Sequence, residues 1–313
     1  MKLLIHFPHL EEPLLNRILE AAQGLETVIA HTEEEAKKEL PGSTILFGFF
    51  PPEVFACRDE SLKWIQSFSA GMDTFLFQEV NESDVIVTGA SGCYGASAAD
   101  SSFGMLLAFT RGLLDPIRQP GSRTRRGPLL ELEGLTLGVL GLGGMGREMA
   151  KRGKGFGMHV VGIDPVISEA PEDVDELVRP EEIDSIIPRL DALMSACALT
   201  PQSRHTINEE RLRMMKPTAY VLNVSRGPII DEQAIIRALK EDWIAGAGLD
   251  VYDVEPLPED SELHTLGNVI LTHHVAGASQ NRQKKFIEVF LENLRRFRNG
   301  EELTNLVNKE RGF

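Results

Sequence analysis

The stretch GLTLGVLGLGGMGREMAKRGKGFGMHVVGID, residues 134–164, decides how this chain folds. It begins as an apolar strand, passes through a glycine loop at residues 141–146, continues as a helical segment and returns to a second apolar strand that ends at Asp164. A G-x-G-x-x-G loop placed between a strand and a helix, with an acidic residue after the next strand, is typical of a dinucleotide-binding unit. A purely structural glycine turn is the alternative interpretation.

Each residue of this motif has a physical task. Gly141 permits the tight turn, Gly143 lets the backbone approach a pyrophosphate, and Gly146 lets the helix pack closely on the sheet. The phosphates would then lie at the positive end of that helix. Asp164 can accept hydrogen bonds from ribose hydroxyls and would repel a 2′-phosphate, and the next basic residue along the chain is Arg179. NAD is therefore predicted as the cofactor in preference to NADP.

Strand-like and helix-like segments alternate along most of the chain. This alternation predicts an α/β fold with two doubly wound parallel sheets, Rossmann-like or flavodoxin-like. An acidic stretch at residues 169–184 is expected to form a solvated helix with its loop. A second series of strands begins at Thr136, and the strands expected before it are Leu3–Phe7, Thr27–His31, Thr44–Phe50, Trp64–Ser69 and Val85–Thr88.

The length of 313 residues is enough for two domains, at roughly 100–200 residues per domain. Two long helical segments, residues 96–111 and 280–298, are expected to cross between the two strand series. The predicted substrate domain is discontinuous, at residues 1–97 plus 279–313, and the predicted cofactor domain covers residues 98–278. An active-site cleft is expected between them.

Composition excludes several classes of protein. The net charge of −15 disfavours nonspecific binding to nucleic acid or to an anionic membrane surface. Three scattered cysteines do not make a disulfide framework, and this favours a reducing, cytoplasmic location. The chain start lacks the long apolar region of a secretory signal, and no apolar run is long enough to span a membrane.

Three later segments each place a reactive side chain just beyond a predicted strand. Arg226 follows AYVLNVS, Glu255 follows GAGLDVYDV, and His274 follows NVILTH. The carboxyl ends of parallel strands meet at one edge of a sheet, so these groups can converge near a bound cofactor. The pair His273-His274 has no cluster of further ligands at suitable spacing, so no metal is predicted.

The chemistry of these three groups is complementary. A protonated imidazole can donate a proton to a carbonyl oxygen that gains negative charge when hydride is transferred. A carboxylate beside the imidazole favours its protonated form, and a guanidinium binds a substrate carboxylate with two parallel hydrogen bonds. Taken singly, each residue is as readily a surface or structural residue. Together, behind a dinucleotide motif, they indicate a 2-hydroxyacid dehydrogenase acting in either direction.

Four stretches carry a resemblance to a known family. They read VLGLGGMGREMAKRGKGFGMHVVGIDP, MMKPTAYVLNVSRGPIIDEQAIIRALK, GAGLDVYDVEPLP and NVILTHHVAGAS. In them the chain resembles the D-isomer-specific 2-hydroxyacid dehydrogenase family, which includes phosphoglycerate dehydrogenases and glyoxylate/hydroxypyruvate reductases. The catalytic Arg, Glu and His of that family fall on Arg226, Glu255 and His274. Where the family often has Pro before its catalytic His, this chain has His273.

The resemblance also implies contacts with cofactor and substrate. SFSAGMD resembles the family's substrate loop, whose backbone amides bind a carboxylate, and this places Ala70 and Gly71 in the site. SGCYGASAAD resembles a second substrate loop, in which Tyr94 would shape the pocket. A homodimer is implied as well. The family's cofactor contacts fall on Gly144, Met145, Asp164, Cys197, Val224 and Asp250.

The predicted function is that of an NAD-dependent oxidoreductase interconverting a small 2-oxoacid, such as glyoxylate or hydroxypyruvate, and a D-2-hydroxyacid. Two alternatives stay open. A 3-phosphoglycerate-type dehydrogenase would need basic residues to hold the phosphate, and SFSAGMD and SGCYGAS offer none. A non-catalytic NADH-sensing binding protein of the same fold would not need the three reactive side chains.

Overall fold

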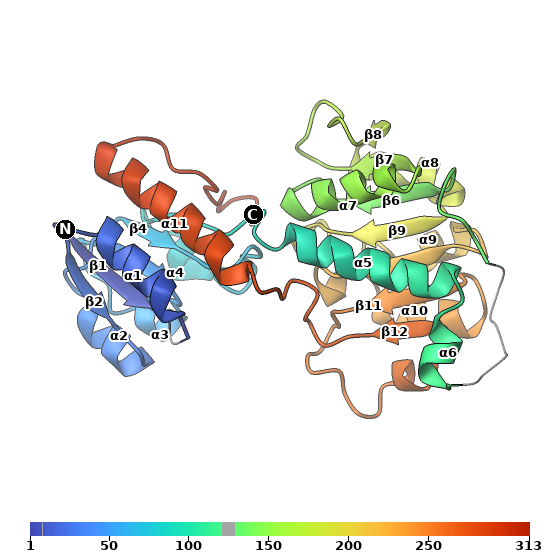
Figure 1. Cartoon of the computed structure of the whole chain (residues 1–313), viewed down its shortest axis with the longest axis horizontal. Helices are drawn as coiled ribbons and strands as arrows, with labels where there is room; N and C mark the ends of the chain where they lie inside the picture. Colours follow the sequence, from blue (N-terminus) through green and yellow to red (C-terminus); the bar gives the residue numbers. More distant parts are fainter. Residues whose placement is uncertain (8, 121–128) are drawn as a thin grey trace. The chain divides into compact units, whose positions relative to one another are not determined.

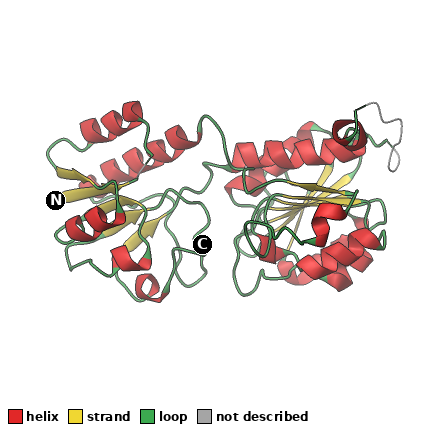
Figure 2. Ribbon diagram, turned by 90° about the horizontal axis from the view of Figure 1, so that it is seen from below, coloured by secondary structure: helices red, strands yellow, loops and turns green. Residues whose placement is uncertain are grey.

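The computed structural model of the chain describes residues 1–7, 9–120 and 129–313 and divides into two compact units. Unit 1 consists of Met1–Cys93 and Ser279–Phe313, and unit 2 consists of Tyr94–Ala278. Each unit contains one parallel β-sheet with helices on both of its faces (Figures 1 and 2). The predicted fold class, α/β with two doubly wound parallel sheets, is confirmed.

Unit 1 has a five-stranded sheet in the order β2-β1-β3-β4-β5, which is the flavodoxin-like order. Its strands are β1 (Lys2–His6), β2 (Glu26–Ile29), β3 (Ile45–Gly48), β4 (Trp64–Gln66) and β5 (Ile86–Thr88). Its helices are α1 (Glu12–Ala21), α2 (Glu33–Glu39), α3 (Pro52–Phe55), α4 (Gln78–Asn81) and α11 (Arg282–Asn299).

Both faces of this sheet are buried, which explains why its strands lack strict polar alternation. Phe47 on β3 stacks on Phe290 of α11 with ring centroids 4.2 Å apart. The preceding residue, Leu46, points to the opposite face and joins the core that includes residues of α2 and α3. The buried strand residues therefore pack alternately against one of two helical layers.

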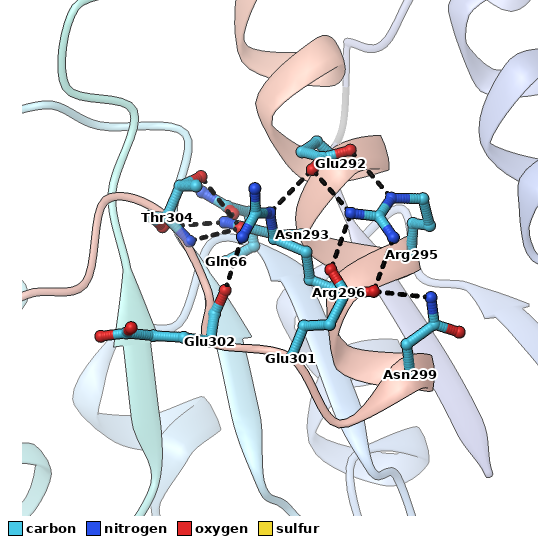
Figure 3. A network of polar contacts seen from close by, with 9 residues as sticks. All are labelled: Gln66, Glu292, Asn293, Arg295, Arg296, Asn299, Glu301, Glu302 and Thr304. Carbon is cyan, nitrogen blue, oxygen red and sulfur yellow. Dashed lines mark hydrogen bonds and ion pairs between the residues drawn. The ribbon is translucent and has the colours of Figure 1, made fainter.

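The segment after α11 is fastened to unit 1 by a polar network (Figure 3). The fully buried Asn293 accepts a hydrogen bond from the backbone N–H of Thr304 at 2.8 Å and donates one to Gln66 Oε1 at 3.0 Å. On the surface, Arg295 pairs with Glu292 and Glu301. The network ties the C-terminal segment to β4, so residues 279–313 belong to the same unit as the N-terminal strands.

Unit 2 has a seven-stranded sheet in the order β12-β11-β10-β9-β6-β7-β8. Its strands are β6 (Thr136–Leu140), β7 (His159–Ile163), β8 (Glu176–Val178), β9 (Ala192–Ser195), β10 (Tyr220–Asn223), β11 (Gly246–Leu249) and β12 (Val269–Leu271). Its α-helices are α5 (Gly95–Thr110), α6 (Leu114–Arg118), α7 (Gly144–Gly155), α8 (Ile183–Ile186), α9 (Glu209–Met214) and α10 (Glu232–Lys240). Short 3-10 helices lie at Pro180–Glu182, Ile187–Arg189, Gly227–Ile229 and Glu262–Thr265.

The strand order of unit 2 reverses between β6 and β9, which are neighbours in the sheet but not in the chain. This is the Rossmann arrangement, and ligands of such sheets bind beyond the carboxyl ends of the strands at the reversal. The loop that follows β6 is the glycine loop. The topology therefore places the predicted dinucleotide motif at the position where a nucleotide binds.

One expectation about this sheet was wrong. Residues 176–178 form the edge strand β8, paired in parallel with β7, within a stretch expected to be a solvated helix with its loop. The one acidic residue of this edge strand, Glu176, forms an ion pair with Arg189 on the surface. Leu177 and Val178 nevertheless pack into the cores on the two opposite faces of the sheet.

The longest helix illustrates how the helices meet the sheets. α11 buries Phe286, Ile287, Phe290 and Leu294, which lie on one side of the helix, and exposes charged residues on the other. None of the helices formed by the described residues is both long enough and apolar enough to cross a membrane.

Candidate active site

The glycine loop of unit 2 forms a tight turn between β6 and α7. Gly141 has a φ of +90°, in the region that favours glycine. A Cβ on Gly146 would lie 1.8 Å from the carbonyl oxygen of Gly141, so only glycine allows α7 to start this close to the strand. Both roles expected from the sequence are present in the structure.

In the described part of the chain, no side chain caps the N-terminus of α7, so a ligand can reach its backbone N–H groups. Its first residue is Gly144, and Gly143 before it provides no side-chain hydrogen bond to the helix end. A Cβ on Gly143 would meet nothing within 4 Å, whereas Met145 is half-buried. Unpaired amides and the helix dipole favour an anion here, so the loop fits the pyrophosphate of a dinucleotide.

Asp164 lies at the carboxyl end of β7 and is buried. Its Oδ2 accepts a hydrogen bond from the N–H of Leu142 in the glycine loop at 2.8 Å, and its Oδ1 accepts from Val166 and Ile167 at 2.8 and 3.0 Å. Arg179 donates to the carbonyl oxygen of Asp164 at 3.2 Å. The basic residue that is distant in sequence therefore lies beside the acid, because β8 pairs with β7.

His274 and Glu255 come from two different loops and form a direct pair. His274 Nδ1 lies 2.7 Å from Glu255 Oε2, and the second carboxylate oxygen accepts the N–H of Tyr252 at 3.1 Å. The side chains remain 48% and 35% exposed, so a substrate can reach them. Since the carboxylate binds Nδ1, Nε2 is left as the second proton site of the imidazole.

Arg226 lies in the loop after β10, which packs on the loop that carries Glu255. A Cβ on Gly227 would be 1.9 Å from the carbonyl oxygen of Tyr252, so the two backbones are in direct contact. The side chain of Asn223 shapes this loop by donating to the carbonyl oxygen of Arg226 at 2.8 Å. Unit 2 thus brings the loop of Arg226 against the loop that carries Glu255. Asn223 shapes the Arg226 loop, and the sequence alone did not point to this role.

Asp250 holds the loop that carries His274. It is fully buried, and its carboxylate accepts hydrogen bonds from Thr272 Oγ1 at 2.5 Å and from the N–H groups of Val275 and Ala276 at 2.9 Å. Its carbonyl oxygen accepts the N–H of His274 at 2.7 Å. His274 itself has a φ of +52°, a left-handed conformation that costs a non-glycine residue about 1–2 kcal/mol. Asp250 stabilises that conformation from both sides.

The start of α5 supports the same loop. Ser97 Oγ donates to the carbonyl oxygen of Gly277 at 3.0 Å. A Cβ on Gly277 would lie 3.3 Å from Cδ1 of Tyr94, so the Tyr94 ring packs on this glycine. Tyr94 therefore lies beside the loop that follows His274. Its predicted contact with substrate stays a prediction.

Two further predicted cofactor contacts lie near the glycine loop and the central strands. Cys197 follows β9, and its backbone is packed on Gly141. Burial raises the pKa of the Cys197 thiol to about 12, so the thiol stays protonated at neutral pH and is a poor nucleophile. Val224 is buried in the core of unit 2.

The predicted substrate loop lies in unit 1, after β4. Ser69 Oγ donates to the carbonyl oxygen of Gly71 at 2.7 Å, which bends the chain around Ala70. Ala70 is exposed and Gly71 is half-buried. The loop is held to the sheet because Ala90 N–H donates to the carbonyl oxygen of Ser69 at 2.8 Å.

Known proteins are similar to this chain in sequence and in fold. The sequence model of the D-isomer specific 2-hydroxyacid dehydrogenase NAD binding domain matches residues 103–276. A glyoxylate reductase of Korarchaeum cryptofilum is 35% identical over 267 residues, covering 82% of this chain and 79% of that protein. A D-3-phosphoglycerate dehydrogenase of Methanocaldococcus jannaschii is 34% identical over 98% of this chain and 59% of that protein.

A solved structure gives the same result for the fold. The D-isomer specific 2-hydroxyacid dehydrogenase from Xanthobacter autotrophicus Py2, in complex with NADPH and MES, has a TM-score of 0.84, 28% identity and coverage of 99% of both chains. The matched domain contains the glycine loop, Asp164, and the loops of Arg226, Glu255 and His274. The chain belongs to the D-isomer specific 2-hydroxyacid dehydrogenase family.

Proposed function

We propose that this protein reduces a 2-oxoacid to the D-2-hydroxyacid with NADH and catalyses the reverse oxidation with NAD. The observation that carries the proposal is the 2.7 Å contact between His274 Nδ1 and Glu255 Oε2, which lies beside the loop of Arg226. A carboxylate-bound imidazole, with the Arg226 loop packed on the loop that carries Glu255, matches a substrate that has a carbonyl group and a carboxylate on neighbouring carbons.

Each side chain has a defined task in the proposed reaction. When NADH is bound, its nicotinamide supplies the hydride to the carbonyl carbon. His274 donates the proton on Nε2 to the carbonyl oxygen as that oxygen gains negative charge. Glu255 stabilises the imidazolium and fixes the orientation of the ring. Arg226 binds the substrate carboxylate through two parallel N–H groups.

A panel of 2-oxoacids tests the proposal directly. NADH oxidation is followed by absorbance with glyoxylate, hydroxypyruvate, pyruvate and 3-phosphohydroxypyruvate, and turnover of at least one is expected. Glyoxylate comes first because relatives at 35% identity are glyoxylate reductases. Tight NADH binding without turnover of any 2-oxoacid would contradict the proposal and favour the NADH-sensing alternative.

The proposed cofactor preference for NAD over NADP depends on Asp164, with Arg179 acting against it. Replacing Asp164 with alanine is expected to weaken NADH binding by about tenfold, since the ribose hydroxyls lose their acceptor. The difference between the dissociation constants of NADH and NADPH should therefore become smaller.

Arg179→Gln is expected to leave NADH binding unchanged and to weaken NADPH binding several-fold, because the guanidinium beside Asp164 can pair with a 2′-phosphate. Dissociation constants from fluorescence titration check both expectations. If neither substitution changes the ratio of the NADPH and NADH dissociation constants, the assignment of cofactor preference to Asp164 and Arg179 is contradicted.

Other expectations from the sequence stay predictions. These are the homodimer, the cytoplasmic location, and substrate contacts from Ala70, Gly71 and Tyr94.

A further inference from the structure

Unit 1 contains a cavity of about 450 Å³, within the range of about 300–1,000 Å³ that small-molecule sites have. His6 at the end of β1 and Phe49 just after β3 form part of its wall. Thr74 and Phe75, which follow the predicted substrate loop, form another part. The cavity therefore lies at the carboxyl ends of the parallel strands, where α/β sheets bind ligands.

An aromatic cluster connects this cavity to the predicted substrate loop. Phe49 and Phe68 pack with ring centroids 4.2 Å apart, and Phe7 lies 5.7 Å from Phe49 and 5.2 Å from Phe68. All three rings are half-buried, and Phe68 directly precedes Ser69. A ligand held by the amides of Ala70 and Gly71 therefore has an aromatic wall beside it.

His6 adds a polar group to this aromatic environment. The residue is only 2% exposed, and its Nδ1 lies 3.1 Å from the carbonyl oxygen of Ala30, so Nδ1 carries a proton. Nε2 makes no hydrogen bond within residues 1–7, 9–120 and 129–313. Every fully buried side-chain nitrogen or oxygen in those residues has a hydrogen-bond partner, so Nε2 is not fully buried. Nε2 is therefore accessible from the cavity that His6 lines.

The charges of the wall disfavour an anionic side chain on the ligand. Glu33 lines the cavity together with His6 and His31, and the described residues of the wall include no lysine or arginine. A phosphate or a second carboxylate is best held by a guanidinium or an ammonium group, and the described residues of this wall supply neither. An aromatic ring, in contrast, finds Phe49 and Phe75 as packing partners.

We propose that this cavity receives the side chain of the 2-oxoacid and that this side chain is an aromatic ring with a para-hydroxyl group. The ring packs against Phe49, and the hydroxyl pairs with His6 Nε2, since a phenol can donate or accept a hydrogen bond. The inference rests on the proposed function, in which Arg226 binds the carboxylate of the same molecule, and on the predicted substrate contacts of Ala70 and Gly71.

Steady-state kinetics at saturating NADH test the inference with 4-hydroxyphenylpyruvate, phenylpyruvate, pyruvate and glyoxylate. We expect kcat/KM to be about tenfold higher for phenylpyruvate than for pyruvate, and several-fold higher again with the para-hydroxyl group. Turnover of pyruvate or glyoxylate with no gain for the aromatic substrates would overturn the inference and leave the proposed function intact.

A binding measurement separates the two proposals when no 2-oxoacid is turned over. That result overturns the proposed function, and the cavity is then tested by calorimetry of the NAD-loaded enzyme with D-4-hydroxyphenyllactate and D-lactate. Tighter binding of the aromatic acid supports the inference, and equal or absent binding overturns it.

Two substitutions locate the effect in the cavity. His6→Leu is expected to abolish the advantage of the para-hydroxyl group and to leave the kcat/KM of phenylpyruvate unchanged. Because His6 is buried and can be needed for folding, Phe49→Leu provides a second variant, expected to lower kcat/KM about tenfold for the aromatic substrates but not for pyruvate. Phe77→Leu is the matched control, since Phe77 is also half-buried but packs on Phe55 at 5.5 Å. An equal loss in Phe77→Leu, or a loss that includes pyruvate, would overturn the inference.

Discussion

Replacing His274 with alanine is expected to lower kcat for 2-oxoacid reduction by about two to four orders of magnitude, the contribution typical of a positioned general acid. The loss follows because no other protonated group is assigned to the carbonyl oxygen in the proposed reaction. The binding of NADH should survive, since the glycine loop and Asp164 do not depend on the imidazole. Steady-state kinetics and a fluorescence titration with NADH measure the two effects separately.

The neighbouring histidine provides a matched control. His273 and His274 are adjacent and both exposed, but of these two histidines only His274 pairs with Glu255. His273→Ala is therefore expected to keep kcat within a few-fold of the natural enzyme. A His274→Ala enzyme with near-normal kcat would remove His274 from its role. Equal losses in both variants would show that the loop, and not the imidazole, is what the reaction needs.

The parts of the site that could be predicted from sequence are those determined by local rules. The turn at Gly141 and the close helix packing at Gly146 follow from spacing alone, because a strand and a helix on either side leave little geometric freedom. The proximity of His274 and Glu255 followed from strand order, since the carboxyl ends of parallel strands share one edge. The structure brings these two side chains within hydrogen-bond distance.

The features that could not be predicted depend on pairing between distant segments. Glu176–Val178 was not recognised as a strand, because an edge strand with one neighbour tolerates acidic residues and shows a weak apolar pattern. For the same reason, the separation of Asp164 and Arg179 along the sequence wrongly suggested that no basic residue lies beside Asp164. The pairing of β7 with β8 places these two residues side by side, which no composition or periodicity reveals.

The role of Asp250 was also only partly predictable. The family resemblance assigned it to the cofactor, and nothing in its local sequence indicates that the carboxylate binds the loop of His274. The signal lies in the structure, where a buried carboxylate needs several hydrogen-bond donors and finds them at Thr272, Val275 and Ala276. A loop that places a non-glycine residue at positive φ requires such support.

Asp250→Ala is accordingly expected to have the second-largest effect. Removing the carboxylate leaves Thr272 Oγ and the buried N–H of Ala276 without their acceptor, so the free energy of unfolding should fall by about 2–4 kcal/mol. The left-handed conformation of His274 would lose the support of the carboxylate, and kcat should fall by about ten- to a hundredfold as the imidazole moves from its productive position. Urea unfolding and steady-state kinetics measure the two losses.

Saturation with NADH distinguishes positioning of His274 from contact with the cofactor. If Asp250 acts only on the cofactor, kcat of Asp250→Ala recovers when the NADH concentration is raised well above the new dissociation constant. If Asp250 positions the imidazole, kcat stays low at saturating NADH, because the defect lies in proton transfer and not in binding. Thr272→Val is the matched control, because it removes one donor to the same carboxylate. The free energy of unfolding should fall by about 1 kcal/mol. The kcat should stay nearly unchanged, since the N–H groups of Val275 and Ala276 still fix the loop. A Thr272→Val enzyme as impaired as Asp250→Ala would show that the loop depends on the threonine hydroxyl and not on the buried carboxylate.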